Sequence, residues 1–223
     1  EFNWARVLVL LKVYRKNMAY HYYSETQENL KSDPNTYTFF FRNNKLLFTS
    51  DIGVFSKKYV DFGSYTLIDT FIPNSTKKSL LDVGCGYGPI GITIAKLYPY
   101  LNIKMIDINE RAISLAKKNV EQNKAQNVTV LKSNIYENIK EEESFDYILT
   151  NPPIRAGKKV IYEIYDGAIK HLNQNGELWV VIQKKQGAPS TIDHLNAIFG
   201  NCEIVTKEKG YFILKSVYRG LDK

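Results

Sequence analysis

Apolar and polar positions alternate along most of the chain in blocks that match strands and helices. From residue 79 onward, short apolar runs typical of buried strands precede stretches in which apolar residues recur every three or four positions, as on one helix face. Strands are predicted at residues 79–83, 102–107, 127–132, 145–150 and 177–182, and helices at residues 89–98, 110–123, 159–172 and 191–199. This alternation predicts an α/β fold with a mostly parallel sheet covered on both faces.

The two ends of the chain depart from this alternation. Residues 202–206 and 211–217 are β-prone and have no helix between them, so they predict an antiparallel C-terminal hairpin that brings the sheet to seven strands. Near the start, residues 37–48 contain two β-prone runs on either side of Asn43-Asn44, a pair that tolerates the positive φ of a tight turn. We therefore expect a small N-terminal β extension beside the main sheet.

The same pattern divides the chain into three parts. Residues 1–17 hold a short apolar run between basic residues and precede Met18, so we expect an added or disordered leader, with a docking helix as the alternative. The apolar run is far shorter than the roughly 20 residues that span a bilayer, so no membrane partner is expected. Residues 18–64 are expected to form the β extension and a loop covering a ligand. Residues 65–223, which begin with a predicted helix at 65–72, form the main domain.

Charge and cysteine content narrow the possible partners. The 223 residues carry a formal charge of +7, from 30 Lys and Arg against 23 Asp and Glu. Such an excess suits nucleic acid, because each basic side chain near a phosphate releases a counterion, and ordinary variation is the alternative. Cys85 and Cys202 belong to no CxxC pair or Cys/His cluster, so no metal is expected. Two isolated thiols fit the reducing cytoplasm.

The segment between the first predicted strand and its helix is rich in glycine. It reads Asp82-Val83-Gly84-Cys85-Gly86-Tyr87-Gly88 and is followed by Pro89. Glycines let the backbone turn sharply and let a ligand approach closely. The dinucleotide pattern G-x-G-x-x-G fails because Pro89 stands at its last position. The observed G-x-G-x-G, with an acid two residues ahead, is the pattern of S-adenosylmethionine-dependent methyltransferases; an ordinary tight strand–helix turn is the alternative. The predicted cofactor contacts are Asp82, Gly84, Cys85, Gly86 and Gly88.

Two further strand ends supply candidates for the same cofactor. Asp107 ends the second predicted strand, with Ile108 next to it, and a carboxylate at this place accepts ribose hydroxyls in nucleotide-binding folds. Its alternative role is to cap the following helix, for which Asn109 is better placed. Asn134 and Ile135 follow the third strand, where we expect contact with the edge and face of adenine.

The segment Asn151-Pro152-Pro153-Ile154 follows the fourth strand and carries the predicted chemistry, and Asn151 is also a predicted cofactor contact. Two prolines make a rigid turn at the sheet edge where ligands bind in open α/β folds. An amino nitrogen on a base or amide is a poor nucleophile because its lone pair is delocalised. If the Asn151 side-chain oxygen and the Pro152 carbonyl accept its two hydrogens, the lone pair points at the methyl group, so positioning supplies most of the catalysis. A proline-stopped strand without a function is the alternative.

These motifs together resemble the class I amino-methyltransferases with an Asn-Pro-Pro motif, and more closely the RsmC-like 16S ribosomal RNA guanine-N2 methyltransferases in a short single-domain form. The matching stretches lie at residues 53–56, 61–64, 81–91 and 151–158, and the resemblance covers roughly residues 20–220. It implies a Rossmann-like class I methyltransferase fold, S-adenosylmethionine as cofactor, and ribosomal RNA or the small ribosomal subunit as partner. Ser56 and Ser64 stand at family-like positions, in a loop expected to cover the methionine end or the substrate.

One departure from the wider pattern concerns the acceptor base. Many amino-methyltransferases carry an aromatic after Asn-Pro-Pro, and Ile154 cannot stack as a π-face. Either Ile154 packs on the base as an apolar wall, or an aromatic from elsewhere takes the role, with Phe55 as the candidate. A basic rim that suits RNA phosphates is predicted from Arg155, Lys158, Lys184 and Lys185. The alternatives are a protein glutamine N5- or DNA adenine N6-methyltransferase, or a non-catalytic RNA-binding assembly factor that retains the fold.

Overall fold

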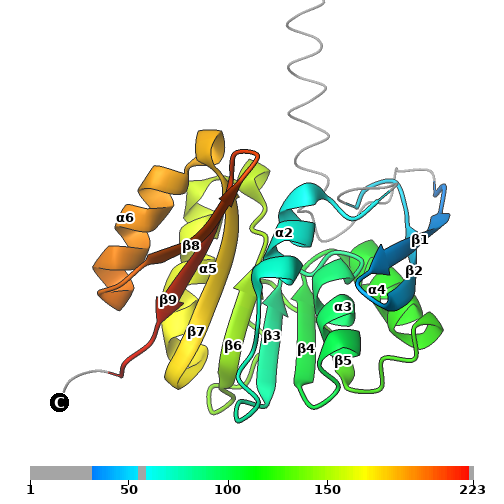
Figure 1. Cartoon of the computed structure of the whole chain (residues 1–223), viewed down its shortest axis with the longest axis horizontal. Coiled ribbons are helices and arrows are strands. Elements are labelled where there is room, and N and C mark those ends of the chain that lie inside the picture. The colour runs from blue at the N-terminus through cyan, green and yellow to red at the C-terminus, as the bar shows by residue number, and fades with distance from the viewer. Residues whose placement is uncertain (1–31, 55–58, 221–223) are drawn as a thin grey trace, which may run out of the picture.

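The computed structural model describes residues 32–54 and 59–220, and its centre is a seven-stranded sheet (Figure 1). The strand order is β5-β4-β3-β6-β7-β9-β8. The strands are β3 (Ser79–Val83), β4 (Asn102–Asp107), β5 (Val128–Lys132), β6 (Phe145–Thr150), β7 (Leu172–Gln183), β8 (Glu203–Glu208) and β9 (Tyr211–Val217). The strands β3 to β7 pair in parallel, while β9 is antiparallel to both β7 and β8. The predicted mostly parallel sheet with an antiparallel C-terminal hairpin is confirmed.

Helices cover both faces of this sheet. The helices are α2 (Phe62–Thr70), α3 (Pro89–Leu97), α4 (Glu110–Gln122), α5 (Lys158–His171) and α6 (Ala188–Phe199), with short 3-10 turns η1 (Ile154–Ala156) and η2 (Lys184–Gln186). Alternate residues of each strand face opposite layers. Leu80 packs in the core shared with α2, α3 and α4, whereas its neighbour Leu81 packs in the core shared with α5 and α6. Both side chains are fully buried.

Parallel pairing brings the functional segments to one edge of the sheet. The glycine loop follows β3, Asp107 ends β4, the Asn-Pro-Pro segment follows β6, and η2 follows β7. Because β3 lies between β4 and β6, the first three of these meet at the centre of the edge. This is the position at which open α/β sheets bind ligands.

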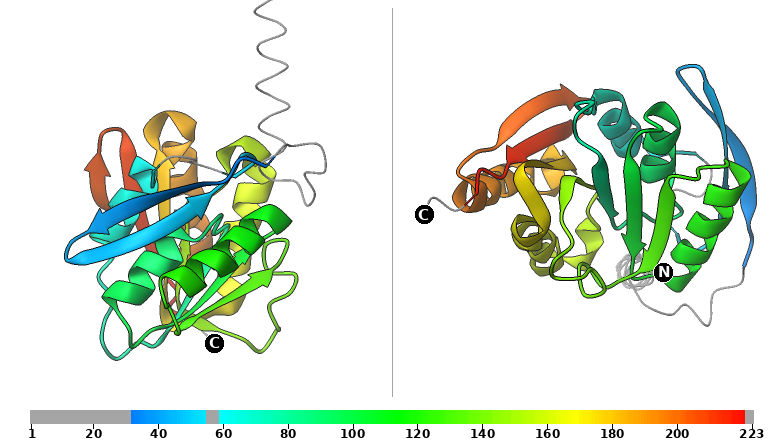
Figure 2. Two further views of the ribbon diagram at one scale, coloured as in Figure 1. Left: turned by 90° about the vertical axis from the view of Figure 1, so that its right-hand side faces the viewer. Right: turned by 90° about the horizontal axis from the view of Figure 1, so that it is seen from below.

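The N-terminal hairpin is a separate two-stranded sheet that lies over α3 and α4 (Figure 2). Its strands are β1 (Asn35–Phe41) and β2 (Asn44–Ser50). The expected turn at Asn43-Asn44 is wrong by one residue, because Asn44 already pairs with Phe41 and the positive φ of 49° falls on Arg42. This register puts Phe41, Leu46 and Phe48 in the core. Burial of these three side chains therefore outweighs the local preference of asparagine for positive φ.

A buried amide attaches the hairpin to the main domain. The Asn119 Nδ2 on α4 donates to the carbonyls of Thr49 and Tyr87, at 2.9 and 2.8 Å, and its Oδ1 accepts from the Thr49 N–H. The hydroxyls of Tyr37 and Tyr87 lie 2.7 Å apart. Tyr87 belongs to the glycine loop, so the hairpin supports that loop directly.

Several predicted boundaries differ from the structure. The first helix begins at Phe62 rather than residue 65, because the Asp61 side chain caps it by accepting from the Ser64 N–H. Strand β7 begins at Leu172, five residues before its predicted start, and α6 begins at Ala188 after Gly187 with φ of 113°. The predicted leader 1–17 and Phe55 lie outside the described residues. The division of the chain at residues 17 and 64 stays a prediction.

Within residues 32–54 and 59–220, no helix is long and apolar enough to cross a bilayer.

Candidate active site

A cavity of about 440 Å³ opens at the carboxyl edge of the sheet. The motifs predicted from the sequence contribute the glycine loop, the end of β4, the turn after β5 and the Asn-Pro-Pro segment. The lining also includes the start of α2, the end of β7 and the start of β9. The cavity thus brings together segments that are up to about 150 residues apart in the chain.

The glycine loop shapes one wall of the cavity. Gly84 and Gly86 have φ of 73° and 57°, and a Cβ built on either would meet no atom within 4 Å. The N–H groups of Gly84 and Cys85 both donate to the Ile106 carbonyl at 2.9 Å, which holds the loop against β4. The missing side chains therefore leave open space directly above a rigid backbone, as a cofactor cradle requires.

Asp107 connects the glycine loop to the tip of β4. Its Oδ2 accepts from the Gly86 N–H at 2.8 Å and its Oδ1 accepts from the Asn109 N–H at 2.9 Å. Burial raises the pKa of Asp107, while these backbone donors act to lower it. Ile108 is a third backbone donor, and a carboxylate has about four acceptor sites, so Asp107 can still accept from a neighbouring hydroxyl. The cap of α4 is Asn109, which accepts from Arg111 N and Ala112 N.

Asp82 lies beneath the glycine loop and does not line the cavity. Its Oδ2 accepts from the Gly91 N–H in α3 at 3.0 Å, and its Oδ1 has no hydrogen-bond partner among the described residues. Of its two predicted roles, contact with the amino-acid end of the cofactor or orientation of the loop, this geometry favours the second. Burial raises the pKa of Asp82 to about 7.

The raised pKa of Asp82 makes the stability of the protein depend on pH. Between pH 4 and 7 the unfolded chain loses this proton while the folded chain keeps it, so the free energy of unfolding falls as pH rises. The penalty reaches its full size above pH 7, on the order of 1–4 kcal/mol. Asp82→Asn is expected to remove this part of the pH dependence, measured by denaturant unfolding from pH 4.5 to 8. If the free energy of unfolding depended on pH in the same way in both proteins, Asp82 would be ionised in the folded state, contrary to this prediction.

The turn after β5 presents a strained residue to the cavity. Ile135 has φ of 51°, a conformation that costs a β-branched residue about 1–2 kcal/mol. The Ser133 Oγ holds it there by donating to the Ile135 carbonyl at 2.8 Å. Ser133 and Ile135 line the cavity, whereas Asn134 is exposed and does not. The predicted contact of Asn134 with adenine stays a prediction.

The Asn-Pro-Pro segment forms the wall opposite β4. Asn151 is partly buried, and its Nδ2 donates to the Ser64 Oγ at 3.0 Å and the Asp61 Oδ2 at 3.3 Å. Both acceptors therefore engage the amide nitrogen, which leaves the Asn151 Oδ1 as a hydrogen-bond acceptor. Among the described residues no group donates to the Pro152 carbonyl. Two acceptors thus stand next to each other in the chain at the cavity wall.

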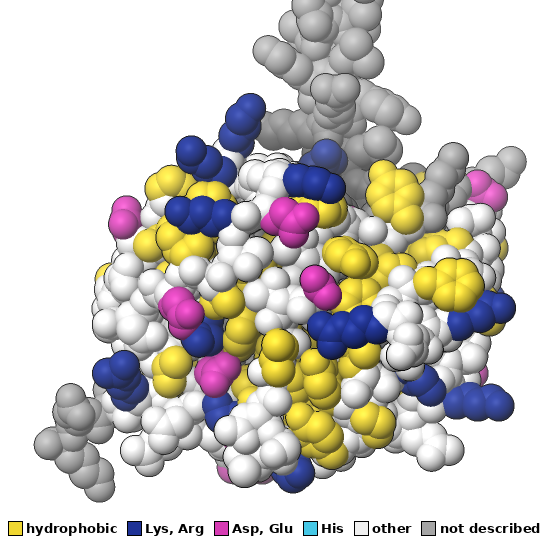
Figure 3. Space-filling view, in the orientation of Figure 1, with side chains coloured by type: hydrophobic (Ala, Val, Ile, Leu, Met, Phe, Trp, Pro, Cys, Tyr) yellow, Lys and Arg dark blue, Asp and Glu magenta, His cyan; other side chains and the backbone are white. Residues whose placement is uncertain are grey.

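The predicted substrate residues fall into two groups. Ile154 and Arg155 line the cavity, whereas Lys158, Lys184 and Lys185 are exposed and lie outside its lining. Figure 3 shows Lys and Arg side chains gathered at the upper edge of the molecule, towards α6 and the β8–β9 turn. These three lysines therefore lie outside the cavity lining, and the basic rim around its opening stays a prediction.

The cavity residues that the sequence analysis missed include Gln183, Gln186 and Tyr211. Strand pairing places Tyr211 opposite Gln183. The Tyr211 ring packs on Gly63, where a Cβ would lie 2.7 Å from Cε1, and its centroid is 5.6 Å from that of Phe62. Tyr211 thus gives the cavity an aromatic wall. No local motif marks these residues. Tyr211, for example, reaches the cavity only because β9 pairs with β7 in the sheet.

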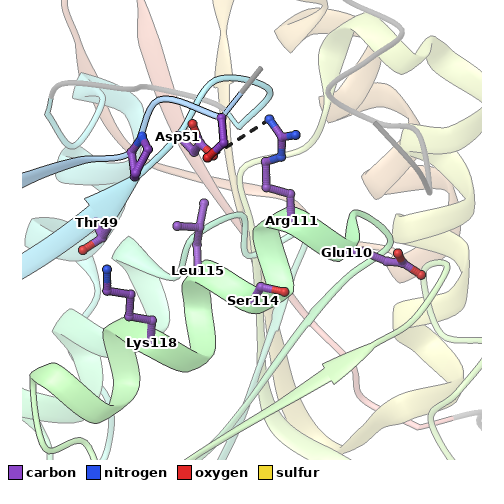
Figure 4. Close-up of a pocket in the computed structure, with 9 residues that line it drawn as sticks. Thr49, Asp51, Glu110, Arg111, Ser114, Leu115 and Lys118 are labelled. Atoms are coloured by element: carbon purple, nitrogen blue, oxygen red, sulfur yellow. Dashed lines mark hydrogen bonds and ion pairs between the residues drawn. The ribbon is translucent and has the colours of Figure 1, made fainter. Parts of the chain in front are cut away.

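A second, shallower hollow lies between β2 and α4 (Figure 4). Arg111 approaches Asp51 to 3.9 Å and donates to the Ile52 carbonyl at 2.7 Å. Lys118 and Thr49 lie farther along the same hollow. Its charged groups tie the end of the hairpin to α4 and lie apart from the predicted cofactor contacts.

Within the part of the chain that the structure describes, no group of three or more His, Cys, Asp or Glu side chains could hold a metal ion.

The family of the chain follows from its sequence as a whole. Residues 45–215 match the family described as the methyltransferase small domain. The chain belongs to this family. The resemblance inferred from the motifs is thereby confirmed, and with it the Rossmann-like class I methyltransferase fold. S-adenosylmethionine is the cofactor of such methyltransferases, so that prediction is confirmed for the family.

Individual relatives agree with this assignment. The chain is 51% identical over 199 residues to the uncharacterized protein YbxB of Bacillus subtilis (strain 168), covering 89% of this chain and 98% of that protein. It is 31% identical over 169 residues to the ribosomal RNA small subunit methyltransferase C of Erwinia tasmaniensis, covering 74% of this chain and 47% of the relative. The chain thus spans about half the length of that relative.

A solved structure shares the fold. The 16S rRNA N2 G1207 methyltransferase (RsmC) of T. Thermophilus, in complex with AdoMet and guanosine, superposes with a TM-score of 0.75 at 23% identity. The superposition covers 85% of this chain and 52% of the other. At this identity the likeness supports the architecture alone.

Proposed function

We propose that this methyltransferase transfers a methyl group from S-adenosylmethionine to the exocyclic N2 of a guanine in 16S ribosomal RNA. The observation that carries the proposal is the fixed amide of Asn151, whose nitrogen is engaged by Asp61 and Ser64 and whose oxygen is left to accept. An acceptor pair at the cavity wall suits an amino group, which has two hydrogens to donate. Hydroxyl and thiol acceptors have one hydrogen and would leave one member of the pair unused.

The cavity offers a separate place for the cofactor. Gly84, Gly86, Asp107, Ile108 and Ile135 line the half of the cavity between β3 and β5. In this proposal the Asp107 carboxylate accepts the ribose hydroxyls and Ile135 packs against adenine. S-adenosylmethionine supplies a methyl group already activated on a sulfonium, so no strong base is required. The chain contributes binding, exclusion of water and alignment of the two reactants.

Asn151 and Pro152 act on the acceptor. The Asn151 Oδ1 and the Pro152 carbonyl accept the two amino hydrogens and so direct the nitrogen lone pair into the cavity. Tyr211 is proposed to provide the flat apolar wall against which the base lies, in place of the aromatic that Ile154 does not supply. The role predicted for Phe55 stays open beside it, since that residue lies outside the described part of the chain.

Ribosomal RNA is the proposed acceptor because both the positive charge of the chain and the names of its relatives favour it. The formal charge is +7, and in this proposal Arg155, Lys158, Lys184 and Lys185 form a basic rim around the opening. Relatives named ribosomal RNA small subunit methyltransferase C share the family. The short helical turn η2 carries two of these lysines next to the cavity residue Gln186, which suits phosphates that flank the target base.

The proposal is tested by supplying radiolabelled S-adenosylmethionine with 30S subunits, naked 16S RNA, DNA or release factors, followed by nucleoside and amino-acid analysis. The expected product is N2-methylguanosine in 16S RNA, from the subunit, the naked RNA or both. Label that appears only in protein, or only as N6-methyladenine in DNA, would overturn it. Calorimetry that detects no cofactor binding would instead favour a non-catalytic assembly factor.

A further inference from the structure

The first turn of α2 lies directly against the Asn-Pro-Pro segment. The Ser64 Oγ and the Asp61 Oδ2 both accept from the Asn151 Nδ2, across 87 and 90 positions of sequence. Both residues line the cavity, and both are buried. We propose that Asp61 and Ser64 are positioning residues that hold the Asn151 amide with its oxygen directed to the acceptor amine.

The orientation of this amide decides whether the site can work. The two ends of an asparagine amide have nearly the same shape and opposite hydrogen-bonding character. With the oxygen inward, Asn151 accepts a hydrogen from the substrate amine. If the amide were turned over, the two N–H groups of Asn151 would face the two N–H groups of the substrate amine, and no hydrogen bond would form. The backbone and the two prolines allow both orientations of the Asn151 amide equally well. The side chains around the amide must therefore select one of them.

Asp61 and Ser64 are themselves held in place. The Asp61 Oδ2 also caps α2 by accepting from the Ser64 N–H at 3.1 Å, and the Asp61 carbonyl accepts from the Tyr65 N–H at 2.9 Å. The Tyr211 ring covers Gly63 between them. The Asp61 carboxylate therefore cannot move away from Asn151 without disturbing the start of the helix.

Helix capping alone does not account for this arrangement. A cap needs one side-chain oxygen, and Asp61 supplies it. The Ser64 hydroxyl has no part in the cap, and within the described residues Asn151 is its sole hydrogen-bond partner. A carboxylate and a hydroxyl that converge on one amide nitrogen fit the task of fixing that amide.

The kinetic part of the test rests on the proposed function. Ser64→Ala removes one acceptor, and at saturating cofactor kcat is expected to fall about 10-fold, the effect of one hydrogen bond. Asp61→Ser keeps a capping oxygen but is too short to serve both partners, so it is expected to act similarly. Asp61→Asn retains an oxygen at the same place and should restore kcat to within about 3-fold. Cofactor affinity and the acceptor KM should change less than 3-fold throughout.

The matched control is Thr66→Val. Thr66 is another buried hydroxyl residue of α2, and its Oγ1 donates to the Phe62 carbonyl without contacting Asn151. Its loss tests the general effect of removing a hydroxyl from this helix, and kcat should stay near that of the unchanged protein. Equal losses in Ser64→Ala and Thr66→Val would overturn the inference, as would a weakened cofactor affinity with kcat preserved.

A second readout needs no acceptor substrate and separates this inference from the proposed function. In nuclear magnetic resonance spectra, the side-chain NH2 signals of Asn151 should shift and exchange faster with water in Ser64→Ala and Asp61→Ser, and stay in place in Thr66→Val. Unchanged Asn151 signals in the first two variants would overturn the inference. If these signals change while no RNA is methylated, the positioning role stands and the proposed substrate falls.

Discussion

Asn151→Ala is expected to lower kcat by about two to three orders of magnitude while the dissociation constant of S-adenosylmethionine changes less than threefold. The substitution removes the oxygen that accepts one amino hydrogen, an interaction that acts on the reacting nitrogen and contributes most in the transition state. The cofactor half of the cavity, around Asp107 and the glycine loop, is left intact. Steady-state kinetics and calorimetry measure the two quantities.

A matched control for this substitution is Asn196→Ala on α6. Asn196 is exposed, and its change removes the same side chain far from the cavity lining, so kcat should not change. Thermal unfolding of both variants checks that they fold alike. A collapse of cofactor affinity in Asn151→Ala would contradict the assigned role, since it would place Asn151 in cofactor binding.

Asp107→Ala is expected to weaken cofactor binding about 100-fold. In the proposed site the charge-assisted hydrogen bonding to ribose disappears, and one bond of this kind is worth about 1.5–3 kcal/mol. The Gly86 N–H also loses its partner, so the glycine loop is held less firmly. Calorimetric titration with S-adenosylmethionine measures the dissociation constant directly, and it does not depend on the identity of the acceptor.

The control for Asp107 is Glu110→Gln. Glu110 is an exposed acid on the first turn of α4 and pairs with Lys132 at 2.7 Å. Removing its charge tests the effect of net charge near the cavity, and the dissociation constant should change less than twofold. An unchanged dissociation constant in Asp107→Ala would show that Asp107 serves the loop and not the ribose.

The sequence alone located two features that line the cofactor half of the cavity. Gly84 and Gly86 mark a turn that only glycine adopts easily, and Asp107 ends the next predicted strand. These signals are local, and the alternation of strands and helices implies that neighbouring parallel strands end at the same edge. The position of Asp107 at the tip of the neighbouring strand therefore follows from the pattern, and the structure adds a hydrogen bond to it from the Gly86 N–H.

Element boundaries were predicted less well where a tertiary contact outweighs local preference. The start of α2 was placed at residue 65, because Asp61 and Gly63 are typical of a loop when considered alone. In the structure the Asp61 carboxylate caps the helix and Tyr211 packs on Gly63. The turn of the first hairpin moved by one residue for a similar reason, since the register is set by burial of Phe41 and Phe48.

Some features of the fold and of the site could be predicted from the sequence, and others required the structure. The chain by itself determined the fold class, the glycine loop, Asp107 and Asn151-Pro152, because each depends on residues close together in sequence or on the alternation of strands and helices. Only the tertiary structure brought Asp61 and Ser64 to the Asn151 amide, and Tyr211 opposite Gln183. Local periodicity reports which face of an element is buried. Local periodicity does not indicate which distant element covers that face. The strand order and the packing of the whole sheet decide which element does so.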